Sequence, residues 1–257
     1  MSDLKELFER GRWYHCFRHE GMISNGTYDV EKYIDYYGFD SNYSGRTVLD
    51  VGCSDGYFSI WMKKQGAQRV LGVDSNKYDG SLAFVPSNAL RKSHEEKYMQ
   101  YSDDYATFRS VYEYLGLSTP NKLLLMRKLL GLDVEFDNGS VYDLSPYGEF
   151  DVVMCNDLLE HLRDPITAVE QLYFATREKC IITVSSAMKT SWLDRNKPLA
   201  TYVAHIGGGS FFNLSESAAV AICHSAGFKK VDVVSRFDMM NRKHSVVNPH
   251  FVIHAFK

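Results

Sequence analysis

The 257-residue sequence lacks a long apolar run and a leader-like start, and these absences argue against a membrane protein and a secreted protein. No stretch approaches the roughly 20 consecutive apolar residues that a membrane-spanning helix needs. Residues 1–6 read MSDLKE and are too charged for a secretory signal. We therefore predict a cytoplasmic protein without a membrane partner.

Cysteine pairs and an excess of charge of one sign are also missing. The five cysteines are odd in number and scattered, without a C-x-x-C spacing, which predicts neither a disulfide framework nor a zinc site. Lysine and arginine number 29 against 32 aspartates and glutamates. This composition does not favour a nucleic-acid binder, although a local basic patch would suffice for one.

One stretch, residues 48–62, organises the rest of the chain. A short apolar strand leads through Asp50 to Gly52 and Gly56, and a helix-like apolar spacing follows. Glycines let the backbone turn sharply and approach a ligand, and the first turn of a helix presents free N–H groups. A carboxylate at Asp50 would repel a diphosphate but suits an amino or hydroxyl group. The stretch therefore predicts a nucleoside site that does not bind NAD.

Strands and helices alternate beyond this turn, which predicts an α/β fold with a parallel sheet covered on both faces. The second strand ends in Asp74, whose carboxylate is placed to accept hydrogen bonds from both hydroxyls of a ribose. A helix N-cap is the alternative role for Asp74. Further strands are predicted at residues 150–156 and 179–185. Residues 230–234 and 251–256 are predicted to form an antiparallel terminal hairpin at the sheet edge.

Two segments stand outside this alternation. Residues 1–45 are rich in aromatic side chains. We expect Trp13, Tyr14 and His15 either to close one end of the sheet or to form a lid that binds the substrate. Within the main domain, residues 46–257, an insertion at about 85–119 is rich in charge and tyrosine. We expect it to shape an acceptor site, with a homodimer surface as the alternative.

Several motifs together resemble class I S-adenosyl-L-methionine (SAM) methyltransferases over residues 47–184. More narrowly, the chain is similar to the group related to tRNA wobble-uridine (mo5U34) methyltransferases. The motifs that carry this similarity are residues 13–15 (WYH), 48–52 (VLDVG), 130–136 (LGLDVEF), 140–144 (SVYDL) and 161–165 (HLRDP). The resemblance implies a Rossmann-like, seven-stranded, mostly parallel sheet and SAM as the cofactor.

The resemblance also implies roles for single residues at the cofactor. Ser140 departs from the family, since many members carry an acidic residue there, and either its hydroxyl or Asp143 accepts from the adenine amino group. The residues expected to bind the methionine end of SAM are Asp50, Gly52, Cys53, Ser54 and Gly56. The ribose is expected to contact Asp74 and Ser75, and the adenine Ser140, Val141 and Tyr142. Asn156 is expected on the sulfonium side.

Glu160 marks a second departure from the family. Members of the group that transfer a carboxymethyl group carry a tyrosine immediately before the histidine that matches His161. A carboxylate at Glu160 would repel the carboxy group of carboxy-SAM, so the sequence favours ordinary SAM.

A base that takes a proton from the acceptor is expected at the end of the strand before Asp157. His161 is the first choice because an imidazole titrates near neutral pH, with Glu160 or Asp157 orienting it or acting alone. The alternative is that His161 braces the turn at residues 164–165. His205, beside three glycines, is a second candidate, and an exposed loop histidine is its alternative. We predict no metal, because Asp157, Glu160 and His161 are too close in sequence to define a site alone.

Together these patterns predict SAM-dependent methyl transfer to oxygen or nitrogen of a small polar acceptor, such as a sugar or a natural-product intermediate. The alternative acceptor is the wobble uridine of a tRNA, which would receive a methyl or carboxymethyl group. Its phosphates would face Arg91, Lys92, Arg127 and Lys128. An alternative of another class is an inactive SAM-binding scaffold subunit.

Overall fold

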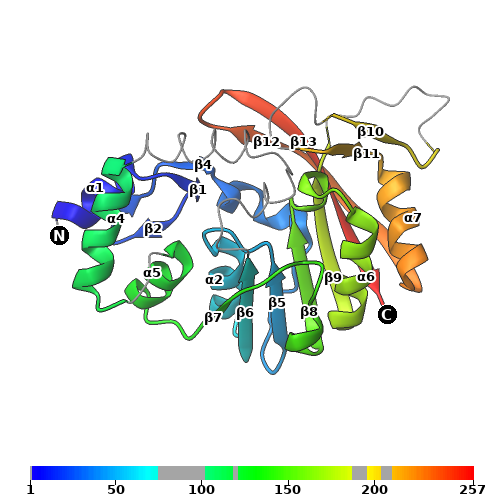
Figure 1. The fold of residues 1–257 in the computed structure, drawn as a ribbon, viewed down its shortest axis with the longest axis horizontal. Coiled ribbons are helices and arrows are strands. Elements are labelled where there is room, and N and C mark those ends of the chain that lie inside the picture. The colour runs from blue at the N-terminus through cyan, green and yellow to red at the C-terminus, as the bar shows by residue number, and fades with distance from the viewer. Residues whose placement is uncertain (1, 75–101, 118–120, 187–195, 204–209) are drawn as a thin grey trace, which may run out of the picture.

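A seven-stranded sheet forms the centre of the computed structural model, which describes residues 2–74, 102–117, 121–186, 196–203 and 210–257 (Figure 1). The strand order is β12-β13-β9-β8-β5-β6-β7. The strands from β9 to β7 are parallel, whereas β13 runs antiparallel to β9 and β12 antiparallel to β13. The predicted fold class and its terminal hairpin are confirmed. The strands are β5 (Thr47–Val51), β6 (Arg69–Asp74), β7 (Glu135–Asn138), β8 (Phe150–Asn156), β9 (Thr176–Ser185), β12 (Lys230–Asn241) and β13 (Val246–Phe256).

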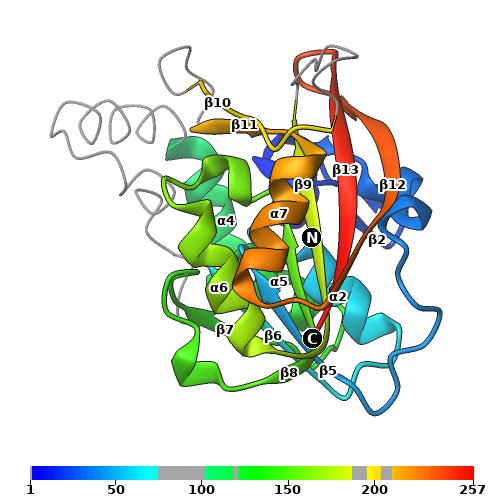
Figure 2. The same ribbon diagram turned by 90° about the vertical axis from the view of Figure 1, so that its right-hand side faces the viewer.

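The strands send alternate side chains to two apolar layers, because neighbouring residues of a strand face opposite sides of a sheet. In β5, Val48 lies in one core with Phe58, and Leu49 lies in the other with Leu172. The first core is covered by α2 (Tyr57–Lys64) and α5 (Lys122–Leu129), and the second by α6 (Pro165–Ala175) and α7 (Glu216–Ala226) (Figure 2). Helices therefore cover both faces of the sheet, as predicted.

Local sequence fixes where three of these helices begin. Asn121, Asp164 and Ser215 are the N-caps of α5, α6 and α7, and each side chain accepts a hydrogen bond from the backbone N–H three residues on. Gly227 ends α7 in the left-handed conformation, with a φ of 115°. These caps set where α5, α6 and α7 begin and where α7 ends.

The N-terminal segment is built into the core on the α2 side of the sheet. Phe8, Trp13 and Tyr37 are buried there together with Phe58. Residues 1–45 therefore share one hydrophobic core with the main domain. The segment consists of α1 (Ser2–Arg10), β1 (Trp13–His15), β2 (Arg18–His19), β3 (Met22–Ile23), β4 (Gly26–Tyr28) and the 3-10 helix η1 (Val30–Tyr37).

The predicted insertion is described in part. Its helix α4 (Ser102–Tyr114) lies beside α1 (Figure 1), and Ser110 Oγ donates a hydrogen bond to Asp3 Oδ2 at 2.9 Å. Residues 85–101 and 118–119 lie outside the described residues. Among the residues that are described, no helix is long and apolar enough to cross a membrane. The remaining short elements are η2 (Ser145–Tyr147), η3 (Leu159–His161), β10 (Ala200–Tyr202) and β11 (Phe212–Leu214).

Candidate functional site

The turn between β5 and α2 is made of left-handed residues. Gly52, Ser54 and Gly56 have φ values of 76°, 52° and 83°. A non-glycine residue in this region costs of order 1 kcal/mol, so Ser54 needs support. Its backbone N–H donates to Asp74 Oδ2 at 2.6 Å, which ties the turn to the end of β6. The sheet order reverses beside β5, and ligands of open α/β sheets bind at the carboxyl ends of strands at such a point.

The two glycines of this turn are required by packing as well as by φ. A Cβ on Gly56 would lie 2.3 Å from Leu123 Cδ1 of α5, and a Cβ on Gly52 would lie 2.9 Å from Leu158 Cδ2. Leucine side chains therefore cover the positions where the sequence predicted a close approach of ligand to Cα. What remains open at the turn is Ser54, which is exposed.

Asp50 and Cys53 lie beneath the turn instead of on its open side. Asp50 is 1% exposed and accepts a hydrogen bond from Ser59 Oγ at 2.5 Å. Burial raises the pKa of this carboxyl to about 6, against the lowering effect of the Ser59 hydrogen bond. Cys53 is also buried, and its sulfur would lie 2.9 Å from a Cβ added to Gly72. These two side chains brace the turn from below, and a cofactor contact by Asp50 or Cys53 stays a prediction.

The loop after β7 closes on itself through local hydrogen bonds. Ser140 Oγ accepts from the backbone N–H of Tyr142 at 3.2 Å, and the Tyr142 hydroxyl accepts from the backbone N–H of Asp164 at 3.3 Å. Val141 is buried in the α6 core, 8% exposed. The loop thus offers the half-buried ring of Tyr142 and the exposed Ser140. Ser75 lies outside the described residues.

Asn156, at the end of β8, has a side-chain amide whose hydrogen bonds show whether a cofactor fits beside the turn. Its Oδ1 accepts from Thr183 Oγ1 at 2.9 Å, whereas its buried Nδ2 has no hydrogen-bond partner among the described residues. A buried donor without an acceptor costs about 1–3 kcal/mol, so a ligand oxygen belongs beside it. The carboxylate at Asp74, the open Ser54 and this amide together fit a nucleoside with a polar tail.

Beyond Asn156 lies a pair of acids that the sheet holds rigidly. Asp157 has a φ of 50°, and its backbone N–H donates to Thr183 O at 2.9 Å. Glu160 on η3 is 2% exposed, and its Oε1 accepts from the backbone N–H of Ser185 at 3.2 Å. Asp157 Oδ1 and Glu160 Oε2 are buried and have no hydrogen-bond partner in the described part of the chain. Burial raises the pKa of Glu160 well above its ordinary range, and the charge of Asp157 raises it further.

Three tyrosines from the N-terminal segment lie around this pair. The rings of Tyr14 and Tyr28 meet edge to face at 5.1 Å, and Tyr37 is fully buried with its hydroxyl unpartnered among the described residues. Burial raises the pKa of each hydroxyl, and the charge of Asp157 adds to the rise at all three. Tyr14 is nevertheless 38% exposed, so its ring is accessible from outside. We call these residues, Tyr14, Tyr28, Tyr37, Asp157 and Glu160, the acid–tyrosine cluster.

His250 of β13 completes the cluster's surroundings and was missed by the sequence analysis. Its Nε2 lies 3.6 Å from Asp157 Oδ1, and its ring stacks on Phe237 at 5.2 Å. Its Nδ1 lies 2.7 Å from the carbonyl oxygen of Asn248. A carbonyl only accepts, so Nδ1 carries a proton, and Nε2 of a neutral ring carries none. Nothing near residue 250 signals this role, because the pairing of β13 with β9 creates it.

The chain matches the family model described as a methyltransferase domain over residues 22–233. The chain belongs to this family. The predicted class, a methyltransferase with a Rossmann-like fold, is thereby confirmed at the level of family and fold.

Curated relatives of the chain are carboxymethyltransferases by name. The chain is 26% identical over 206 residues to a tRNA U34 carboxymethyltransferase of Campylobacter jejuni, covering 77% of this chain and 54% of the relative. It is 24% identical to one of Helicobacter pylori, covering 74% and 59%. The chain therefore spans little more than half the length of these relatives.

Two solved structures show the same fold. The N-terminal domain of EvdMO1 with SAH bound has a TM-score of 0.59 at 15% identity, covering 98% of this chain and 94% of that one. Magnesium protoporphyrin IX methyltransferase of Synechocystis PCC 6803 with bound SAH has a TM-score of 0.53 at 16% identity, covering 89% and 81%.

Three of the predicted acceptor-side residues of this methyltransferase occupy different settings. Trp13 is 1% exposed, and its Nε1 donates to Leu7 O at 3.0 Å, so it is a core residue and not a substrate contact, which corrects the prediction. His15 is buried against Asp55. Of this motif, Tyr14 is the residue whose pKa is raised by burial and by the charges of Asp157 and Glu160.

Of the two histidines predicted as bases, the structure describes His161. His161 is half-buried at the end of η3, next to Glu160. Successive residues of a 3-10 helix point about 120° apart, so His161 faces a different direction from Glu160, and its role stays a prediction. His205 lies outside the described residues.

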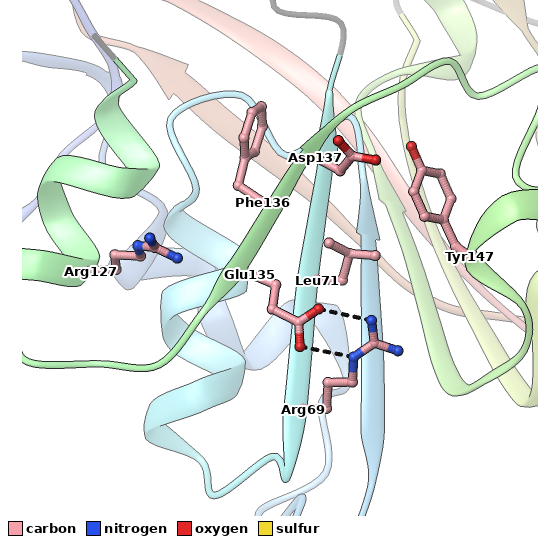
Figure 3. Close-up of a pocket in the computed structure, with 7 residues that line it drawn as sticks. All are labelled: Arg69, Leu71, Arg127, Glu135, Phe136, Asp137 and Tyr147. Atoms are coloured by element: carbon pink, nitrogen blue, oxygen red, sulfur yellow. Dashed lines mark hydrogen bonds and ion pairs between the residues drawn. The ribbon is translucent and has the colours of Figure 1, made fainter. Parts of the chain in front are cut away.

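A surface hollow elsewhere on the molecule is not this site. It has a volume of about 380 Å³ and lies along β6 and β7, where Arg69 and Glu135 form a two-pronged ion pair with a closest N···O distance of 2.8 Å (Figure 3). β7 is the outer strand, three places from β8 in the sheet. Neither Asp157 nor Glu160 lines the hollow, which is also open to solvent. We therefore place the chemistry at the carboxyl ends of β5 and β8.

Proposed function

We propose that this protein transfers a methyl group from SAM to oxygen or nitrogen of a small polar acceptor, such as a sugar or a natural-product intermediate. The observation that carries the proposal is the acid–tyrosine cluster beside Asn156, at the carboxyl end of the strand next to the cofactor turn. Carboxylates and phenol hydroxyls bind polar hydrogens, and the cluster is buried or half-buried except at Tyr14, which suits a compact acceptor.

The chain's own residues have two tasks in such a reaction. SAM, when bound, supplies a methyl group on a sulfonium, and the acceptor displaces the sulfur in line. The residues must hold the acceptor at near contact and take up its proton. Asp157 is the base that the geometry favours, because its Oδ1 lacks a hydrogen-bond partner among the described residues, while burial raises the pKa of Glu160 and makes it the harder of the two to ionise.

The choice of SAM over carboxy-SAM rests on the charge of the same cluster. The curated relatives are named carboxymethyltransferases. Here a buried acid pair occupies the region, and Asp157 remains to repel a further carboxylate even when Glu160 is protonated. Tighter binding of carboxy-SAM than of SAM in a calorimeter would contradict this part of the proposal.

A wobble uridine of tRNA is the second candidate, favoured by the names of the relatives. The basic patch proposed for it is weakened by the structure. Arg127 is half-buried, and its Nη1 donates to Val134 O at 2.5 Å, so it is engaged within the fold. Lys128 is exposed, and Arg91 and Lys92 lie outside the described residues.

One experiment separates these functions. Purified protein and labelled SAM are incubated with a small-molecule extract, with total tRNA, or with tRNA digested by ribonuclease, and SAH is quantified. SAH formed with the extract supports the proposal. Label in intact tRNA, together with tRNA binding that weakens steeply with salt, would favour the second candidate. Binding of SAM without turnover in any pool would indicate a scaffold subunit.

A further inference from the structure

The two acids of the cluster, Asp157 and Glu160, have few positively charged groups beside them in the described part of the chain. Asp157 Oδ1 and Glu160 Oε2 are buried, and neither has a hydrogen-bond partner among the described residues. A buried carboxylate without a partner is strongly destabilising, and native folds retain one where a ligand compensates it. The pair therefore indicates that something donating several hydrogen bonds belongs between these two oxygens.

The groups that face the pair come from five elements. They are Tyr14 of β1, Tyr28 of β4, Tyr37 of η1, Ser185 of β9 and His250 of β13. In the part of the chain that the structure describes, the basic side chain placed at this pair is His250, and its Nε2 is 3.6 Å from Asp157 Oδ1, longer than a hydrogen bond. The tyrosines add aromatic faces and hydroxyl oxygens but no charge.

We propose that the acceptor is an amine, bound as an ammonium ion between Asp157 and Glu160 with the rings of Tyr14 and Tyr28 beside it. This rests on the proposed methyl transfer and names its acceptor atom as nitrogen. An ammonium group has up to three N–H donors, enough for both unpartnered oxygens and a tyrosine hydroxyl. An alcohol has one O–H and leaves at least one carboxylate oxygen unpaired. Aromatic faces also attract organic cations.

The proton balance is consistent with this arrangement. The ammonium R-NH3⁺ gives one proton to the Asp157 carboxylate, which leaves the nitrogen lone pair of R-NH2 free. That lone pair forms the N–C bond as the C–S bond breaks, so the sulfonium becomes a neutral thioether and the product is R-NH2-CH3⁺. The positive charge moves from sulfur to nitrogen and stays beside the acids.

A metal ion is the other cation to consider. Among the described residues, no group of three histidine, cysteine, aspartate or glutamate side chains is arranged to hold one. The aromatic lining also favours an organic cation over a strongly hydrated divalent ion. We therefore assign the cluster to an ammonium group, and the test includes a metal arm.

Thermal unfolding of the full chain tests cation recognition without knowledge of the natural acceptor. Melting is followed in about 0.2 M methylammonium chloride, NaCl and, at equal ionic strength, MgCl2, each with and without SAH. We expect methylammonium to raise Tm by about 2–4 °C over NaCl, as binding to the folded state alone would. The rise should vanish in Glu160→Gln and Asp157→Asn and persist in Glu170→Gln, a matched change on the exposed face of α6. Equal Tm in methylammonium and NaCl, or a rise with MgCl2 alone, would overturn the proposal.

Turnover with matched acceptor pairs tests the same assignment in the reaction. Amino sugars and their hydroxyl counterparts, for example 2-amino-2-deoxyglucose and glucose, are compared by SAH formation. We expect amines to be preferred by at least about tenfold, the size of one lost hydrogen bond to a charged group. Methylation of the alcohols alone would overturn the amine assignment and leave the proposed methyl transfer intact. Failure to bind SAH would instead defeat the proposed methyl transfer, while the Tm comparison still decides on the cation.

Discussion

Asp55 of the cofactor turn accepts three hydrogen bonds from the N-terminal strand, one of them from His15 Nδ1 at 2.5 Å. The other two come from the backbone N–H groups of Tyr14 and His15, at 2.9 and 2.8 Å. Burial would raise the pKa of Asp55, but the charge and hydrogen bonds of His15 hold it below the ordinary value. The glycine turn proposed to bind the cofactor and the strand that carries Tyr14 are thus joined through one carboxylate.

Asp55→Asn should weaken the hydrogen bonds between the turn and the N-terminal strand. The amide keeps the size of the side chain but loses the charge and one acceptor, so we expect a loss of about 2–4 kcal/mol in the free energy of unfolding at pH 7. Because the folded pKa of Asp55 is depressed, its contribution is present above the unfolded pKa near 4 and is lost as pH falls through the lower folded value. Urea titrations at pH 7 and pH 3 measure this. An equal deficit at both pH values would contradict the charge-based account.

Asp50→Asn should have the opposite effect on stability. The folded pKa of Asp50 is raised to about 6, so the wild-type carboxyl favours folding below about pH 4, and this contribution is lost as pH rises through 6. We expect the variant to be more stable than wild type by up to about 3 kcal/mol at pH 7.5, with little difference at pH 4. Asn Oδ1 still accepts from Ser59 Oγ, so the packing is kept. A variant less stable at pH 7.5 would show that the buried charge has a partner.

Gly56→Ala should destabilise the fold by more than the free-energy cost of placing an alanine at a positive φ. The new Cβ would lie 2.3 Å from Leu123 Cδ1, and we expect a loss of about 2–4 kcal/mol. Gly45→Ala is the matched control, because Gly45 has a φ of 77° and an added Cβ there would have no atom within 4 Å, so about 1 kcal/mol is expected. Denaturant melts compare the two. Equal losses would show that α5 moves aside.

Asp74→Ala should weaken binding of SAH at least about tenfold, because a ribose loses its carboxylate acceptor and the Ser54 N–H loses its partner. Asp137→Ala, on the next strand, is the control, and its affinity should match wild type. Isothermal calorimetry measures both. Unchanged affinity in Asp74→Ala would remove this residue from the ribose role.

Asp157→Asn should lower the rate of methyl transfer by about 10²–10⁴-fold, the usual contribution of a general base. His161→Ala should lower it less than about tenfold, because the 3-10 helix turns His161 away from Glu160. Single-turnover rates with saturating SAM compare the two variants. The reverse order of effects would restore His161 as the base.

Sequence patterns were sufficient where the structure is local. The glycine turn, the apolar strands and the terminal hairpin could all be predicted from the sequence, and the roles of Asp157 and Glu160 stay predictions. The contributions of Tyr28, Tyr37 and His250 could not, because they depend on how η1, β4 and β13 come together in three dimensions. Trp13 failed for the same reason, since an aromatic run does not show which of its rings enters the core.

The N-terminal segment has a practical consequence for how the domain is delimited. Similarity to the family begins at Met22, yet Phe8 and Trp13 are buried, and the Trp13 ring lies 5.3 Å from the rings of both Phe8 and Phe17. A chain trimmed to the family boundary would expose the inner face of α2 and lose Tyr14 and His15 as well. Similarity alone would thus divide a single folding unit, and the first 21 residues belong to any chain used to study acceptor recognition.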